Sequence, residues 1–282
     1  MRNKSGCWQP AFAFALAGMA TGVALFWIEW FVTGKHLHTE DLCYRIFENC
    51  FPLPDGIMAI FLLLTAGLIM MNSPWAALTG LLAAGMSLHL GALDLVYHLQ
   101  QRNLADWANP ETWSRAFIIA VTLGLGSFTV AWFARQFPTA PSSRRIPTAW
   151  RVVAGLIVLE LAFTLVYWYT QLTADHSATP ECAREFHQAF FLADGLNVAT
   201  GAATLAGMVL RKGWGVALGL VHAGLALFGT LIYGAFSALN PDLIEGQQNA
   251  YSILLVSFLF YISFLTWAFW RHRPGRSLSR SG

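Results

Sequence analysis

The feature that most constrains this chain is a series of long apolar runs, each close to the roughly 20 residues that a helix needs to cross a bilayer. The backbone finds no hydrogen-bond partner in lipid, so a spanning segment must be a helix or part of a closed barrel. The runs lack the alternating polar and apolar period of barrel strands. The sequence therefore predicts helical spans at about 11–32, 53–71, 75–98, 113–134, 149–171, 190–210, 213–237 and 250–270.

The composition agrees with this prediction. Hydrophobic residues make up 56% of the 282 residues and charged residues only 11%, whereas soluble domains carry about 25% charged residues. The first run follows Arg2 and Lys4 as a secretory signal would, but it continues to Phe31 and is too long for the apolar part of a signal. We expect a retained span, with cleavage near Ala20 as the alternative. The predicted fold is an all-α integral membrane protein with eight transmembrane helices.

The distribution of basic residues predicts the orientation. Most Lys and Arg residues fall at the N-terminus, in the even-numbered loops or at the C-terminus, and positive charge stays on the cytoplasmic side. Both termini are therefore expected in the cytoplasm, with the protein in a plasma or inner membrane. The net charge of +2 reflects this topology, so we expect membrane lipid and no nucleic acid as a partner, and the basic tail 271–280 is interpreted as an orientation signal.

An internal duplication is visible when the sequence is shifted by 139 residues. Residues 51–98 then align with 190–237 without a gap. The matched pairs include Phe51/Phe190, Asp55/Asp194, Gly56/Gly195, Thr65/Thr204, Trp75/Trp214, Gly80/Gly219, Ala84/Ala223 and Gly85/Gly224. Each copy holds an even number of spans, so the sequence predicts two tandem four-helix repeats in parallel orientation. The repeats are 1–135 and 149–282, joined by a Pro- and Ser-rich cytoplasmic linker at 136–148.

Two aspartates of the duplication, Asp55 and Asp194, lie where the second and sixth spans begin. One interpretation is helix capping, because Asp is a preferred N-cap and its charge complements the helix dipole. The other is that two symmetry-related carboxylates frame a cavity that opens to the outside.

Polar stripes on the third and seventh spans favour the functional interpretation. Asp94 and His98 lie one turn apart on the third span, and His222 and Tyr233 lie on one face of the seventh. An Asp and a His inside an apolar span are expensive unless they are paired or face water. We therefore expect these side chains to line a site.

Glu160 is the deepest acid in the predicted spans. It shares a helix face with Thr164 and Tyr167, and Asn197 shares a face with Asp194 on the next span. Glu29 is the proposed counterpart of Glu160, since both begin a Glu-x-x-x-Thr pattern that aligns with a shift of 131 residues.

The cysteines and histidines predict neither a metal site nor a cofactor. His36 and His38 lie in a predicted loop without a Cys, His or carboxylate framework around them, which favours a solvated loop over a metal site. Cys43, Cys50 and Cys182 fall on the predicted outer side. A Cys43–Cys50 disulfide is plausible there, and a bridge from Cys182 to the first copy stays open.

Each half resembles the emopamil-binding-protein family of sterol isomerases and ligand-binding proteins. The resemblance lies in four spans per module and in "LFWIEWFVTGKHLHTEDL", "PLPDGIMA" and "LDLVY". It implies membrane-embedded acids around a cavity for a sterol or a cationic amphiphile, and in the isomerase these acids move protons on a carbon–carbon double bond. The matching residues are Glu29 and Asp55 with Asp94 nearby, and Glu160 and Asp194. Leu25 stands where the isomerase has a histidine, so the resemblance supports ligand binding more directly than isomerisation.

These observations lead to one main functional hypothesis. The protein is expected to bind a hydrophobic or amphipathic, isoprenoid- or lipid-like molecule in a polar-lined cavity that opens outward, with acid–base isomerase or cyclase chemistry as an extension. The candidate catalytic residues are Glu160, Asp194, Asp94 and Glu29. The candidate ligand-binding residues are Asp55, His98, Asn197, Thr164, Tyr167, His222 and Tyr233. The alternatives are a proton-coupled transporter and a non-catalytic membrane assembly factor.

Overall fold

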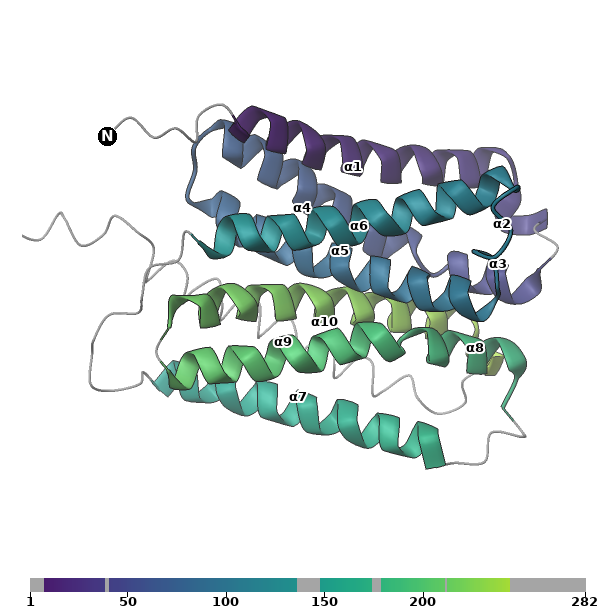
Figure 1. Cartoon of the computed structure of the whole chain (residues 1–282). Coiled ribbons are helices and arrows are strands. Elements are labelled where there is room, and N and C mark those ends of the chain that lie inside the picture. Colours follow the sequence, from purple (N-terminus) through teal and green to yellow (C-terminus); the bar gives the residue numbers. More distant parts are fainter. Residues whose placement is uncertain (1–7, 39–40, 136–147, 174–178, 211, 244–282) are drawn as a thin grey trace, which may run out of the picture.

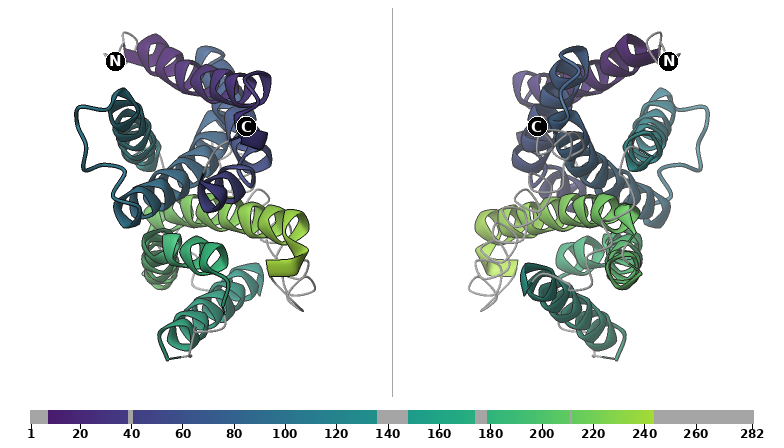
Figure 2. Two further views of the ribbon diagram at one scale, coloured as in Figure 1. Left: turned by 90° about the vertical axis from the view of Figure 1, so that its right-hand side faces the viewer. Right: turned by 90° about the vertical axis from the view of Figure 1, so that its left-hand side faces the viewer.

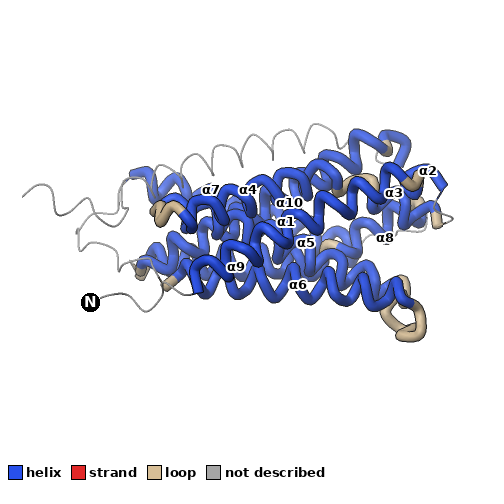
Figure 3. The backbone as a smooth tube through the Cα atoms, turned by 90° about the horizontal axis from the view of Figure 1, so that it is seen from above, coloured by secondary structure: helices blue, strands red, loops and turns tan. Residues whose placement is uncertain are grey.

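The computed structural model describes residues 8–38, 41–135, 148–173, 179–210 and 212–243, and these residues form helices and no strands (Figure 1). The helices are α1 (Trp8–Val32), α2 (Lys35–His38), α3 (Leu42–Glu48), α4 (Pro52–Met70), α5 (Trp75–Gln100), α6 (Pro110–Ala134), α7 (Thr148–Thr173), α8 (Glu181–Ala189), α9 (Phe191–Val209), α10 (Gly213–Leu239) and the 3₁₀ turn η2 (Pro241–Leu243). The long helices lie side by side along the bundle, and α2, α3 and α8 lie together at one end of it (Figure 3).

Seven helical segments of the described residues are long and apolar enough to cross a membrane. They coincide with seven of the expected spans, while the expected span at 250–270 and residues 136–147 of the linker lie outside the described residues. Large apolar side chains are exposed along the bundle, among them Phe14, Phe117 and Phe163. An apolar exposed surface of this kind is typical of a protein that lies in a membrane.

The long helices form two groups that meet along α5 and α10 (Figures 1 and 2). One group contains α1, α4, α5 and α6, and the other contains α7, α9 and α10. Gly85 of α5 and Gly224 of α10 permit the close approach, because a methyl group at Gly85 would overlap the backbone carbonyl of Val221. At Gly224 it would overlap the carbonyl of Leu82.

Several contacts between the two groups join residues that are 139 positions apart. They are the Cys43–Cys182 disulfide, the Phe47–Phe186 ring contact, the Gly85–Gly224 backbone contact and the His89–Phe228 ring contact. The prediction of a Cys43–Cys50 disulfide is therefore wrong, and Cys50 is a buried free thiol whose Sγ lies 3.1 Å from the carbonyl oxygen of Ile46. Seven residues of helix and coil separate Cys43 from Cys50, whereas α3 packs directly against α8.

The short helices α3 and α8 fill the end of the bundle where the sequence predicts loops. Asp41 caps α3 by accepting a hydrogen bond from the backbone N–H of Tyr44 at 3.0 Å. Phe47 of α3 then stacks on Tyr97 of α5 with ring centroids 3.9 Å apart. In the second group, Phe186 of α8 stacks on Phe236 of α10 at 3.7 Å.

Candidate functional site

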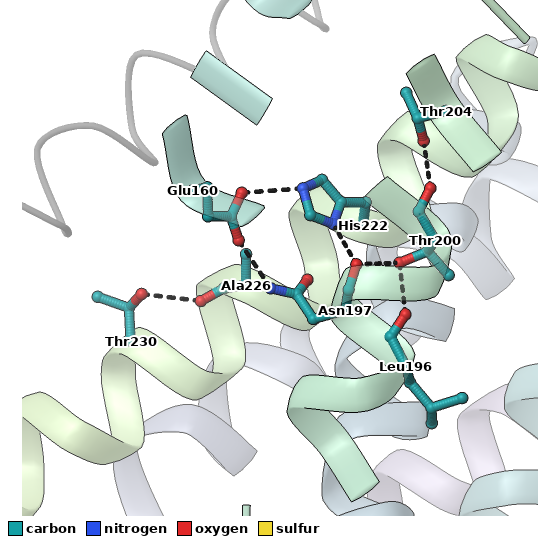
Figure 4. Close-up of polar contacts among 8 residues, drawn as sticks. All are labelled: Glu160, Leu196, Asn197, Thr200, Thr204, His222, Ala226 and Thr230. Carbon is teal, nitrogen blue, oxygen red and sulfur yellow. Dashed lines mark hydrogen bonds and ion pairs between the residues drawn. The ribbon is translucent and has the colours of Figure 1, made fainter. Parts of the chain in front are cut away.

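Three of the predicted site residues meet midway along the second group of helices (Figure 4). Glu160 from α7, Asn197 from α9 and His222 from α10 form one hydrogen-bonded network. The amide of Asn197 donates from Nδ2 to Oε1 of Glu160 at 2.7 Å, and Nε2 of His222 lies 2.9 Å from Oε2. His222 is fully buried, while the Glu160 side chain keeps 13% of its surface exposed. The network therefore holds a carboxyl group, an imidazole and an amide within an apolar layer.

The seat of His222 is made by α9. Nδ1 of His222 lies 3.1 Å from the backbone carbonyl oxygen of Asn197. One helical turn further on, Gly201 faces the ring, and a Cβ at that position would lie 2.9 Å from Cε1 of His222. The i, i+4 spacing of Asn197 and Gly201 thus places an amide and a gap on the same helix face.

The threonines around the network do not extend it. Thr200, Thr204 and Thr230 each donate to a backbone carbonyl three or four residues earlier in their own helix (Figure 4). Such bonds satisfy a hydroxyl group inside a membrane helix without a partner from another helix. Thr164, a predicted ligand-binding residue, is half-buried one turn beyond Glu160 on α7.

Asp194 lies on the outer side of this network and is not a helix cap. Its Oδ2 accepts a hydrogen bond from the indole of Trp168 at 3.0 Å, and its charge interacts with that of Glu160. Asp55 makes the same contact with Trp27, also at 3.0 Å.

The N-caps of α4 and α9 are Phe51 and Phe190, and neither makes a side-chain capping bond. The capping interpretation is therefore wrong. Both aspartates lie in the first helical turn, where their charge still complements the helix dipole.

An outer polar layer covers the same group of helices toward α8. The hydroxyl of Tyr167 lies 2.8 Å from Nδ1 of His187 and 3.2 Å from the hydroxyl of Tyr233. Tyr167 and Tyr233 are predicted site residues, but His187 was expected in a solvated loop. Its position on α8, in an amphipathic segment one turn before Phe191, is the signal that could have identified it.

The first group of helices carries a separate set of acids. Asp94 of α5 lies close enough to Glu48 of α3 and Asp55 of α4 to interact electrostatically with both. His98 contacts the ring of Tyr44 with centroids 6.2 Å apart. Glu48 is only 8% exposed, and the sequence did not single it out because it lies outside the predicted spans. The polar stripes of α5 and α10 thus face into their own groups and not toward each other.

Glu29 does not occupy a position equivalent to Glu160. Its side chain is 60% exposed at the end of α1, where it forms an ion pair with Lys35 at 2.7 Å. The matching contacts Trp27–Asp55 and Trp168–Asp194 align α1 with α7 by a shift of 141 residues. With that shift the counterpart of Glu160 is Met19. The paired aromatics of "FW" at 26–27 and "YW" at 167–168 are the signal that could have given this register.

No group of three or more His, Cys, Asp or Glu side chains among the described residues is arranged to hold a metal ion. No family model, curated protein or solved structure matches the chain. The residues themselves therefore carry the functional argument.

Proposed function

We propose that the chain is a multi-pass protein of a plasma or inner membrane, with eight spans and both termini in the cytoplasm. The apolar surface of the bundle supports membrane insertion. The Cys43–Cys182 disulfide lies at the end that the distribution of basic residues assigns to the outside. Disulfides persist in oxidising compartments, so this bond supports the same orientation from chemistry that is independent of charge.

We also infer that the two groups of helices are tandem repeats in parallel orientation. When a two-fold axis relates two halves, residues that meet on the axis are equivalents of each other. The four contacts between residues 139 apart support such an axis. The axis would run along the helices, because Cys43–Cys182 lies at one end of the bundle and Gly85–Gly224 lies within it.

The second repeat is proposed to bind a hydrophobic or amphipathic small molecule of isoprenoid- or lipid-like character between α7, α9 and α10. The observation that carries this proposal is the Glu160–Asn197–His222 network at mid-helix depth. Ionisable groups at such depth are expensive and usually functional. Oδ1 of Asn197 is buried and has no hydrogen-bond partner among the described residues. It favours a ligand that carries a hydrogen-bond donor, such as a hydroxyl group.

Acid–base chemistry is a natural extension of this binding site. Glu160 would give a proton to an alkene of the ligand, and a second carboxylate would stabilise the cation that forms. Asp194 fits the second role because its charge already interacts with that of Glu160. Asp94 fits it less well, because its charged neighbours are Glu48 and Asp55 of the first repeat.

The test is to identify the small molecules that stay with the protein during purification in mild detergent. Mass spectrometry of extracts from the wild type, Glu160→Gln and Glu181→Gln would be compared, with circular dichroism to verify folding. Glu181→Gln is the matched control, since Glu181 is exposed at the start of α8 in the same repeat.

We expect a recurrent hydrophobic species in the wild type and the control, and about tenfold less of it in Glu160→Gln, since a hydrogen bond to a charged group is worth about 1.5–3 kcal/mol. Equal amounts in all three proteins, or no such species in the wild type, would contradict the proposal.

The two other proposals predict different results in the same preparation. A proton-coupled transporter would move its ligand unchanged into vesicles, and a membrane assembly factor would retain a protein instead of a small molecule. The disulfide and the Gly85–Gly224 contact weigh against a transporter whose repeats rock apart at the outer end, because both tie the repeats together there and at mid-depth.

A further inference from the structure

We propose that Glu160 and His222 hold one exchangeable proton between them, and that Asn197 and Gly201 are positioning residues that fix which imidazole nitrogen shares it. The proposal deepens the function proposed for the second repeat, since it names the group that would exchange a proton with a bound molecule. The contacts that carry it are those drawn in Figure 4.

The first step concerns Nδ1 of His222. Its partner at 3.1 Å is the backbone carbonyl oxygen of Asn197, and a carbonyl oxygen can only accept a hydrogen bond. Nδ1 must therefore carry a hydrogen in every protonation state that keeps this contact. The tautomer of the neutral ring is fixed by the contact that the other nitrogen does not make.

The second step concerns Nε2, which is the only ring nitrogen left to gain or lose a proton. It lies 2.9 Å from Oε2 of Glu160. Two arrangements satisfy this distance: an imidazolium that donates to a carboxylate, and a neutral imidazole that accepts from a carboxylic acid. Both contain one proton between Nε2 and Oε2, and both leave the pair with no net charge.

The third step concerns the alternatives with more or fewer protons. Without the shared proton, a carboxylate would face the lone pair of Nε2, and the charge would have no counter-ion at the centre of apolar helices. With a second proton, an imidazolium would face a carboxylic acid and would likewise lack a counter-charge. Unpaired charge is strongly disfavoured at this depth, so the one-proton state is the stable one.

The neighbouring groups do not change this count. Asn197 donates from Nδ2 to Oε1 of Glu160, which directs Oε2 toward His222. Asp194 on α9 is the charged neighbour of the pair. The remaining titratable side chains of the packed helices are Tyr167, His187, Tyr233 and His89.

Gly201 keeps the ring in place because no other residue fits under it. A Cβ at Gly201 would lie 2.9 Å from Cε1 and 3.3 Å from Nδ1 of His222. Gly201→Ala should push the ring away from the Asn197 carbonyl and release the tautomer. Gly195 is the matched control on the same helix, because a Cβ there meets nothing within 4 Å.

The experiment is nitrogen NMR of the full-length protein in detergent, labelled with ¹⁵N at histidine, with His222→Gln to assign the signals. We expect Nδ1 of His222 to carry a hydrogen at every pH at which the protein is folded, and the Nε2 signal to shift in Glu160→Gln. In Gly201→Ala the two nitrogens should show mixed tautomers, and in Gly195→Ala the wild-type signals should remain.

A His222 ring protonated only at Nε2, or signals that are the same in Glu160→Gln and the wild type, would overturn the proposal. The wild-type spectrum alone decides the first point, so an unfolded variant does not block the test. These signals are independent of any ligand. A protein that binds no small molecule but shows the expected tautomer would refute the proposed function and leave the proton site intact.

Discussion

At the scale of single residues, Asp55 and Asp194 make the same contact in different surroundings. Each accepts an indole hydrogen bond, and an Asn in either place keeps an oxygen acceptor. We therefore expect Asp55→Asn and Asp194→Asn to change the free energy of unfolding by about 1 kcal/mol or less. Only Asp194 lies near Glu160, so Asp194→Asn should lose most of the bound small molecule and Asp55→Asn should lose less.

Thermal unfolding in detergent and mass spectrometry of the extracted ligand measure the two effects. Asp106→Asn serves as the control, since Asp106 is exposed in the turn between α5 and α6. Full ligand retention in Asp194→Asn would show that its carboxylate acts only as a partner of Trp168.

The site could be predicted residue by residue but not as an assembly. Glu160, Asn197 and His222 are each conspicuous, because they are polar residues within apolar runs. Their meeting depends on how α7, α9 and α10 are rotated about their axes, and apolar runs do not specify that rotation. Glu29 was misplaced for the same reason, since a short Glu-x-x-x-Thr match outweighed the Trp–Asp contacts that set the register of α1.

At the scale of elements, α5 and α10 depend on two glycines at their crossing. A methyl group at Gly85 or Gly224 would overlap backbone atoms of the other helix, which cannot move as a side chain can. We expect Gly85→Ala and Gly224→Ala to lower the free energy of unfolding by about 1–3 kcal/mol. Gly124→Ala on α6 is the control, because a Cβ there meets nothing within 4 Å. Thermal unfolding in detergent is the measurement, and an unchanged melting temperature in both crossing variants would contradict the packing.

The short helices α3 and α8 join the two repeats covalently. A protease site inserted within 136–147 would cut the chain between the repeats. Because Cys43 and Cys182 are bonded, the two fragments should migrate together on a non-reducing gel and separate on reduction. Cys50→Ser should behave as the wild type, and Cys43→Ser should give separate fragments in both gels. Fragments whose linkage depends on Cys50 would refute the assigned pairing.

These two elements show where sequence patterns stop being informative. The long helices could be predicted to within a few residues because their apolar length is set by the bilayer. α3 has seven residues and α8 nine, and both are too short and too polar to stand out among loops. Their place is set by tertiary packing, as the stacking of Phe47 on Tyr97 illustrates.

At the scale of the whole molecule, the two proposed repeats have diverged in chemistry. With the shifts of 141 for α1 and 139 elsewhere, the first-repeat counterparts of Glu160, Asn197 and His222 are Met19, Met58 and Ala83, all buried. Conversely, Glu48 and Asp94 of the first repeat correspond to His187 and Tyr233. The deep proton-sharing pair therefore belongs to one repeat alone, and the first repeat supplies an apolar match that packs at the same depth.

The last prediction concerns the direction in which the molecule crosses the membrane. Two independent features place α2, α3 and α8 outside: the disulfide between α3 and α8 and the scarcity of basic residues in the predicted outer loops. The turn before α6 lies at that end of the bundle, and the turn between α4 and α5 lies at the opposite end (Figure 1). In a background without Cys7 and Cys50, Asp106→Cys should react with a membrane-impermeant maleimide on intact cells, because Asp106 is exposed in the first of these turns. Met71→Cys, which replaces a side chain that is 76% exposed, should react only after permeabilisation. A reporter fused after Arg280 should be cytoplasmic if the region beyond α10 adds the eighth span. The reverse labelling would refute the orientation, and labelling of both cysteines from one side would refute α5 as a span.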